Sequence, residues 1–130
     1  MKHFLNFIFF LFLTSSLQSQ EVVWLDANLE KTSQDKADFY RIDEKLEGEI
    51  IYYYKKRTKF RKVFYTKGKL NGLFYEYYET GKLKETGVYE NGLREGIWKE
   101  FYKGGKIKSK GKYSKGDKVG IWKLHFKNDR

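Results

Sequence analysis

The strongest constraint on this sequence is a repeat with a period of 24 residues. Gly72, Gly96 and Gly120 lie 24 positions apart, and no gap interrupts the register between them. Fixed-period similarity indicates a repeat architecture, and it predicts an array from about Gly48 to Phe126, with three full units and a truncated fourth. The same spacing relates these sets: Phe74, Trp98 and Trp122; Tyr78, Tyr102 and Phe126; Leu83 and Ile107; Gly87 and Gly111.

Each unit has the pattern of a β-hairpin. Aromatic residues from Gly96 to Tyr102 favour a strand, a Gly-containing turn follows, and a second strand is predicted from Lys106 to Tyr113. Thr80 disfavours a two-residue turn that needs positive φ at that position, so we expect a three-residue loop with Gly81 left-handed. The predicted fold is therefore all-β: a repeat array of antiparallel β-hairpins that forms an elongated single-sheet meander.

The loop sets the predicted register and the two faces of the sheet. It pairs Tyr77 with Leu83, and beyond them Glu76 with Lys84 and Leu73 with Gly87. Because side chains alternate along a strand, one predicted face carries mostly apolar residues, and we expect it to be the core face. Its members are Leu73, Tyr77, Leu83 and Tyr89 with Ile97, Phe101, Ile107 and Tyr113.

The N-terminus has the layout of a signal peptide. A short basic start precedes the ten residues Phe4 to Leu13, which are all apolar except Asn6, and a small polar stretch follows. Ten helical residues reach about 15 Å, roughly half the hydrocarbon core of a bilayer. We expect residues 1–19 to be removed, which leaves an exported protein without a transmembrane span. An uncleaved anchor and a buried helix are the alternatives.

The charge of the mature chain is distributed unevenly. Residues 20–47 form an acidic flank, whereas residues 48–130 form the repeat domain with 22 basic and 9 acidic residues, a net charge of +13. This asymmetry permits docking of the flank on the array and attracts anions to the array. Within the flank, Val22 to Leu25 is predicted as a strand, and Thr32 to Ile42 fits either a short helix or a strand.

The composition excludes most enzymatic chemistry. The chain has no Cys and only two His residues, His3 and His125, so thiolate metal sites and cysteine nucleophiles are absent. His125 stands in the aromatic column of the repeat, and no paired-carboxylate or Ser-His-Asp spacing is evident. We therefore predict no enzyme, no cofactor and no metal site.

The basic and aromatic residues of the last units form the candidate binding site. Lysines at alternate positions are predicted to point one way, on the face that carries the tryptophans. Two interpretations stay open: lysines can be a solvated face that discourages edge pairing, or an anion-binding strip beside aromatics that stack on sugars or partner side chains. The aromatics likewise suit packing between hairpins. The candidate residues are Trp98, Tyr102, Lys106, Lys108, Lys110, Lys112 and Trp122.

These residues also carry a resemblance to a known family. The Gly-x-Trp-x-x-Phe-Tyr segment at 96–102, the Gly105-Lys106 turn, and Gly111-Lys112-Tyr113 through Gly120 resemble the MORN-repeat variant family. The resemblance spans residues 48–126 and implies a hairpin meander that contacts proteins or membranes, with no active site. Members are often described as bacterial antitoxin-like proteins, and the exported N-terminus resembles secreted members.

The sequence thus predicts an exported, non-enzymatic scaffold of the cell envelope. Its expected partner is a protein or an anionic glycan or lipid surface. The alternative function is an antitoxin or immunity protein that neutralises one cognate toxin. An envelope enzyme is the third class. Nucleic acid suits the basic and aromatic surface but not an exported protein.

Overall fold

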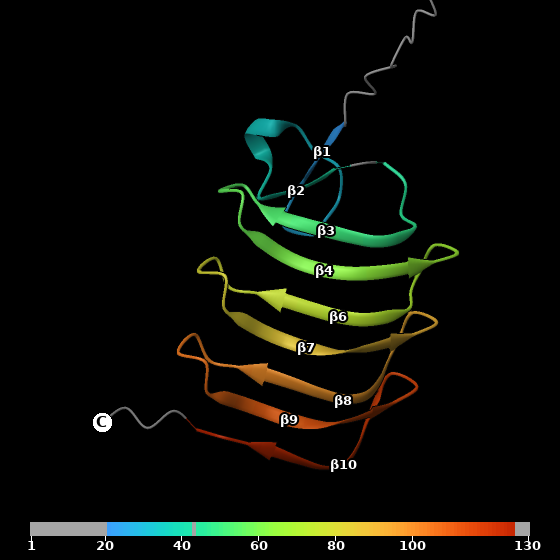
Figure 1. Cartoon of the computed structure of the whole chain (residues 1–130), viewed down its shortest axis with the longest axis vertical. Helices are drawn as coiled ribbons and strands as arrows, with labels where there is room; N and C mark the ends of the chain where they lie inside the picture. The colour runs from blue at the N-terminus through green and yellow to red at the C-terminus, as the bar shows by residue number, and fades with distance from the viewer. Residues whose placement is uncertain (1–20, 43, 127–130) are drawn as a thin grey trace, which may run out of the picture.

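A computed structural model describes residues 21–42 and 44–126, and within them all ten strands belong to one sheet. Every pairing between neighbouring strands is antiparallel, and the strands stack in chain order from β1 to β10 (Figure 1). This arrangement confirms the predicted all-β single-sheet meander. The predicted signal peptide lies outside the described residues.

The strands are short, as a hairpin repeat requires. The small strand β5 pairs with β4 at the edge of the path. The bounds are β1 Val22–Leu25, β2 Phe39–Ile42, β3 Gly48–Tyr54, β4 Lys59–Thr66, β5 Lys69–Leu70, β6 Gly72–Tyr77, β7 Leu83–Glu90, β8 Leu93–Phe101, β9 Ile107–Ser114 and β10 Asp117–Leu124.

The acidic flank extends the sheet at its N-terminal end. The predicted strand at Val22–Leu25 is confirmed as β1, and Asp26 closes the following turn by accepting a 2.8 Å hydrogen bond from the backbone N–H of Asn28. The ambiguous segment contains both candidates: a 3₁₀ turn at Gln34–Lys36, named η1, and then strand β2. Because β2 pairs with β3, the described flank continues the repeat sheet.

The predicted hairpin loop is confirmed. Gly81 has φ +90°, and its N–H donates a 2.8 Å hydrogen bond to the carbonyl of Tyr78. The N–H of Tyr78 in turn donates to the carbonyl of Lys82 at 2.8 Å, and Tyr77 pairs with Leu83. Gly105 repeats this geometry one unit later, with φ +97°.

Beyond the loop the predicted register is wrong by one residue. A β-bulge follows the Tyr77–Leu83 pair, so Glu76 lies opposite Glu85 instead of Lys84, and Phe74 lies opposite Gly87. The next hairpin has the same bulge, because Phe101 pairs with Ile107 but Glu100 pairs with Ser109. An extra residue on one strand exchanges the faces of everything that follows it.

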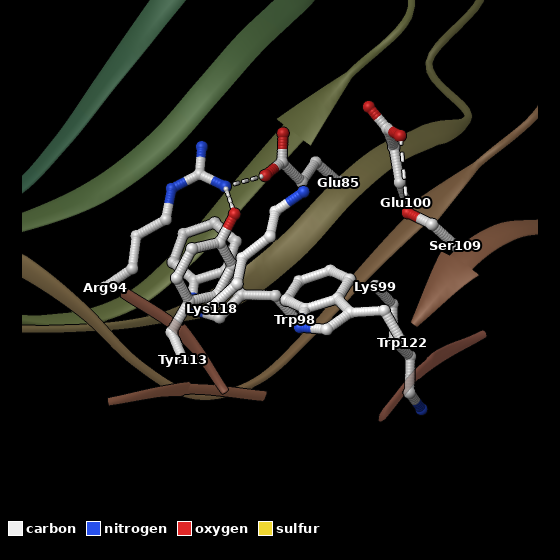
Figure 2. Close-up of a pocket in the computed structure, with 9 residues that line it drawn as sticks. All are labelled: Glu85, Arg94, Trp98, Lys99, Glu100, Ser109, Tyr113, Lys118 and Trp122. Atoms are coloured by element: carbon white, nitrogen blue, oxygen red, sulfur yellow. Dashed lines mark hydrogen bonds and ion pairs between the residues drawn. The ribbon is translucent and has the colours of Figure 1, made fainter. Parts of the chain in front are cut away.

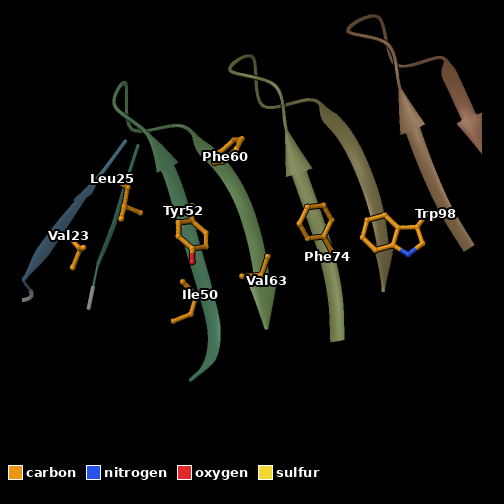
Figure 3. Close-up of a cluster of buried hydrophobic side chains, with 8 residues drawn as sticks. All are labelled: Val23, Leu25, Ile50, Tyr52, Phe60, Val63, Phe74 and Trp98. Atoms are coloured by element: carbon orange, nitrogen blue, oxygen red, sulfur yellow. The ribbon is translucent and has the colours of Figure 1, made fainter. Parts of the chain in front are cut away.

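The predicted core face is also wrong. Phe74 and Trp98 are 4% and 2% exposed, whereas Leu73 and Ile97, their neighbours in sequence, are 49% and 51% exposed. The buried side chains lie along one face of the sheet (Figure 3). We call it the tryptophan face, defined by Phe74, Glu76, Glu85, Trp98, Glu100 and Trp122. The cluster comprises Val23, Leu25, Ile50, Tyr52, Phe60, Val63, Phe74 and Trp98.

Glycine creates the space for the buried Trp98 and the partly buried Trp122. A Cβ atom at Gly87 would lie 2.1 Å from the indole ring of Trp98, and one at Gly111 would lie 2.1 Å from the ring of Trp122. The large ring of one strand therefore covers a residue without a side chain on the preceding strand. A glycine inside a strand permits this close approach because it has no side chain.

A column of tyrosine hydroxyls ties successive units together. Tyr54 donates to the carbonyl of Tyr77 at 2.7 Å, Tyr78 donates to that of Phe101 at 2.6 Å, and Tyr102 donates to that of His125 at 2.5 Å. Each bond links a unit to the next, which explains the tyrosines at this position of the period. The column binds neighbours, as stability in a repeat array requires.

Candidate functional site

The bulge separates the predicted binding residues onto two faces. Trp98 pairs directly with Gly111, whereas Lys110 pairs with Lys99 and Lys112 pairs with Ile97. Directly opposite residues share a face, so Lys110 and Lys112 point away from the side that carries Trp98. The expectation of one basic strip beside the tryptophans is wrong.

The tryptophans and Tyr102 take part in packing. The ring of Trp98 contacts Phe74 and Tyr89 with centroids 5.3 and 5.2 Å apart, and its indole N–H donates to the carbonyl of Glu95 at 3.2 Å. Trp122 meets Tyr113 edge to face at 5.1 Å. Tyr102 uses its hydroxyl in the inter-unit column.

Lys106 and Lys108 lie near the β8–β9 loop. The carbonyl of Lys106 accepts a 2.8 Å hydrogen bond from the N–H of Tyr102. Lys108 is the extra residue of the bulge, and its ammonium lies 3.9 Å from a carboxylate oxygen of Glu100 and 5.9 Å from the centroid of the Tyr102 ring. Lys108 therefore stays on the tryptophan face, apart from Lys110 and Lys112.

A hollow of about 200 Å³ on the tryptophan face is lined by interacting charged side chains (Figure 2). The guanidinium of Arg94 lies 2.7 Å from the carboxylate of Glu85, 3.3 Å from the hydroxyl of Tyr113 and 4.1 Å from the centroid of the Trp98 ring. The hollow is lined by Glu85, Arg94, Trp98, Lys99, Glu100, Ser109, Tyr113, Lys118 and Trp122.

Three carboxylates follow one another across the strands beside this hollow. Glu76 lies opposite Glu85, and Glu85 lies opposite Glu100, so like charges are direct neighbours. Burial raises the pKa of Glu85, the carboxylates of Glu76 and Glu100 raise it further, and Arg94 opposes the shift. Arg61 contacts Glu76 at 2.9 Å. The ion pairs with Arg94 and Arg61 offset the negative charges of Glu85 and Glu76 from within the chain.

The described residues contain neither a candidate metal site nor a candidate membrane-spanning helix. Among residues 21–42 and 44–126, no group of three or more His, Asp or Glu side chains is placed to hold a metal ion. In the same part of the chain, no helix has the length and apolar character needed to cross a bilayer.

The opposite side of the sheet exposes both lysines and aliphatic side chains. We call it the lysine face, defined by Leu73, Val88, Ile97, Lys99, Lys110, Lys112, Ile121 and Lys123. Lys99 pairs with Lys110, and Lys110 pairs with Lys123, so three ammonium groups follow one another across β8, β9 and β10. None of them makes an ion pair with another described residue. Ile121 beside them is 91% exposed.

Sequence reasoning missed Lys99 and Lys123 as members of this surface. The alternation of lysines from 106 to 112 was visible, but the bulge after Lys108 moves two of them to the other face, where they join lysines from β8 and β10. The signal in the sequence is Gly111. The ring of Trp122, on the next strand, covers this glycine, which fixes the face on which the rings lie.

The fold defines a class of protein: an open, single-layer β-hairpin repeat array. Residues 70–91 and 94–115 each match the family model of the MORN repeat variant, which identifies two repeats of this kind within the array. Such repeats generally take part in interactions with proteins or membrane lipids. No curated protein matches the chain.

Proposed function

We propose that this protein is an exported, non-enzymatic scaffold of the cell envelope whose lysine face binds a protein or an anionic surface. The observation that supports the proposal is the row formed by Lys99, Lys110 and Lys123. Like charges directly opposite each other destabilise a sheet, and these have no described carboxylate to offset them. An anionic partner would remove that repulsion.

The exposed aliphatic residues support the same surface. Leu73, Ile97 and Ile121 recur at 24-residue intervals on the lysine face, and Ile97 lies next to Lys112 across the strands. Exposed apolar patches on a soluble fold mark interaction sites when polar residues surround them. A basic, partly apolar face fits a partner that offers anionic groups and apolar groups together.

Export is proposed from the N-terminal sequence. The full chain, expressed in a bacterium, should lose residues 1–19 and appear in the envelope or medium with a new N-terminus near Gln20. Fractionation followed by N-terminal sequencing checks this. An intact Met1 in a soluble cytoplasmic pool would contradict export. That measurement does not address the binding surface, which is tested in a separate experiment.

The binding experiment compares two charge reversals of equal size. Purified protein is incubated with envelope extract and, separately, with vesicles of neutral phosphatidylcholine with or without anionic phosphatidylglycerol. The variant Lys110→Glu/Lys123→Glu should lose retention, and retention of the parent should fall with salt because exposed charges are screened beyond roughly 8 Å at physiological ionic strength.

The matched control is Lys82→Glu/Lys106→Glu, which changes net charge equally at two exposed positions in the hairpin loops. It should keep most of the binding. Equal loss in both variants would indicate a general charge effect and contradict the assignment to the lysine face. Recovery of one toxic protein as the sole stoichiometric partner would favour the antitoxin alternative.

A further inference from the structure

The lysine face contains a hollow that a partner with a flat surface would leave empty. Its volume is about 310 Å³, roughly ten times the share of one water molecule in the liquid, which is ample for an aliphatic side chain. The hollow lies over β6, β7 and β8. Its lining is mostly apolar and consists of Leu73, Tyr75, Thr86, Gly87, Val88, Ile97 and Lys99.

One wall of this hollow is the beginning of the lysine row. Lys99 lines the hollow, and Lys110 and Lys123 continue from it on the next two strands. Neighbouring strands are about 4.8 Å apart, so the row runs along the long axis of the array at that interval. The surface thus presents an apolar depression followed by a line of regularly spaced cations.

We infer that this surface binds an acidic, amphipathic polypeptide segment of a partner protein. An aliphatic side chain of the segment enters the hollow between Leu73, Val88 and Ile97, and carboxylates that follow it meet Lys99, Lys110 and Lys123. The inference rests on the proposed function and names the partner class of the same face. Hot spots of protein interfaces have this form, with an apolar anchor in a pocket and charges at the rim.

The geometry favours a polypeptide over the other anionic partners. A lipid headgroup layer offers negative charge, but its plane has no projecting apolar group at the position of the hollow. A linear acidic glycan or nucleic acid matches the lysine row and leaves the hollow without an apolar occupant. A polypeptide segment that carries both kinds of side chain matches Val88 and Lys110 together.

The test uses the full mature protein and a panel of synthetic peptides. Each peptide carries one leucine and a following run of glutamates at varied spacing, and fluorescence anisotropy reports binding. Two matched sets replace the leucine by serine, or the glutamates by glutamine. At least one parent peptide should bind, and its two matched forms should bind about tenfold more weakly or worse, a difference of about 1.4 kcal/mol.

The hollow is tested with two valines on the lysine face. Val88, which lines the hollow, and Val119, which lies outside it, are both 37% exposed. Val88→Asn should weaken peptide binding about tenfold, whereas Val119→Asn should keep it within about twofold. Melting curves of both variants establish that they are folded. Lys110→Glu/Lys123→Glu is a second, exposed change that should also weaken binding.

Three outcomes would overturn the inference. No peptide of the panel binds the parent protein, or the serine-substituted peptides bind as well as the leucine peptides, or Val88→Asn and Val119→Asn are indistinguishable. If anionic vesicles bind in a Lys110-dependent way while the peptides do not, the inference fails and the proposed function stands. If neither binds, and Lys110→Glu/Lys123→Glu retains envelope proteins as the parent does, both fail.

Discussion

Ile97 and Trp98 are consecutive residues of β8, but they lie on opposite faces of the sheet and differ in burial. Trp98 lies on the tryptophan face, where its ring covers Gly87 and contacts Phe74 and Tyr89. Ile97 lies on the lysine face and is half exposed, with Lys112 as its cross-strand partner. The same backbone therefore supports one packed face and one solvated face.

The comparison teaches how a single-layer sheet obtains a core. Most domains bury a sheet face against a second layer. Here wide aromatic rings are laid over glycines of neighbouring strands, so the rings are buried by one another and by the backbone. On the lysine face Leu73, Ile97 and Ile121 are 49%, 51% and 91% exposed, so these side chains are accessible to a partner.

The largest effect on stability is expected when one residue on each face of β8 is replaced by alanine and the two variants are compared. Trp98→Ala should reduce the free energy of unfolding by about 3–5 kcal/mol, because it removes a fully buried aromatic side chain and leaves a cavity. Ile97→Ala, the adjacent change on the lysine face, should cost only about 0.5 kcal/mol. Urea denaturation followed by fluorescence of the remaining tryptophans and by circular dichroism measures both. Comparable losses would show that both faces are packed.

The second effect sharpens the role of the glycine notch. Gly111→Ala places a methyl group 2.1 Å from the ring of Trp122, so the ring must move, and overpacking of this kind costs about 1–3 kcal/mol. Gly104→Ala adds the same methyl where nothing lies within 4 Å. Thermal melts should separate the two variants clearly. A Gly111→Ala protein as stable as Gly104→Ala would mean that the ring does not depend on the notch.

The sequence predicts the part of the fold that depends on local geometry. The loop at 79–81 follows from the intolerance of Thr80 for positive φ, and Gly81 has the left-handed conformation. The period follows from identical residues at identical spacing. These features need no knowledge of distant contacts, which explains why strand order and hairpin type agree with expectation.

The faces depend on a bulge that the residue pattern does not reveal. With Glu76 opposite Lys84 the unbulged register looked favourable, because it joined opposite charges. The actual register places Glu76 opposite Glu85 and still brings Lys84 within 3.9 Å of Glu76. Apolar residues occur on both sides of each strand, so alternation alone does not identify the core. The packing of Trp98 over Gly87 decides it.

For the candidate site, the sequence predicts residue types but not the face of the sheet on which each residue lies. The sequence predicts a site of basic and aromatic residues in the last units, but in the structure these residues lie on separate faces of the sheet. Trp98 and Tyr102 satisfy contacts inside the array, and Lys110 and Lys112 belong to the exposed side. Whether these lysines bind a partner stays a prediction for the experiments above.

The smallest expected effect concerns the carboxylate row of the tryptophan face. Burial, together with Glu76 and Glu100, raises the pKa of Glu85 above its value in the unfolded chain, although Arg94 opposes the shift. The folded state therefore binds the proton of Glu85 more tightly than the unfolded state. Glu85 contributes stability at pH values below the pKa of the unfolded carboxyl, and this contribution is lost as the pH rises through the higher pKa of the folded state.

Glu85→Gln removes that contribution because the amide does not titrate. Between about pH 4 and about pH 7, which spans the titration of a carboxyl with a raised pKa, the free energy of unfolding of the variant should therefore fall less, or rise more, than that of the parent. Denaturation curves at a series of pH values measure the difference. The control Glu90→Gln changes an exposed carboxylate at the end of β7 and should keep the parental pH dependence. If Glu85→Gln keeps it too, the charges of the tryptophan face are fully balanced by Arg94, and that face is insensitive to pH in the range where the carboxylates titrate.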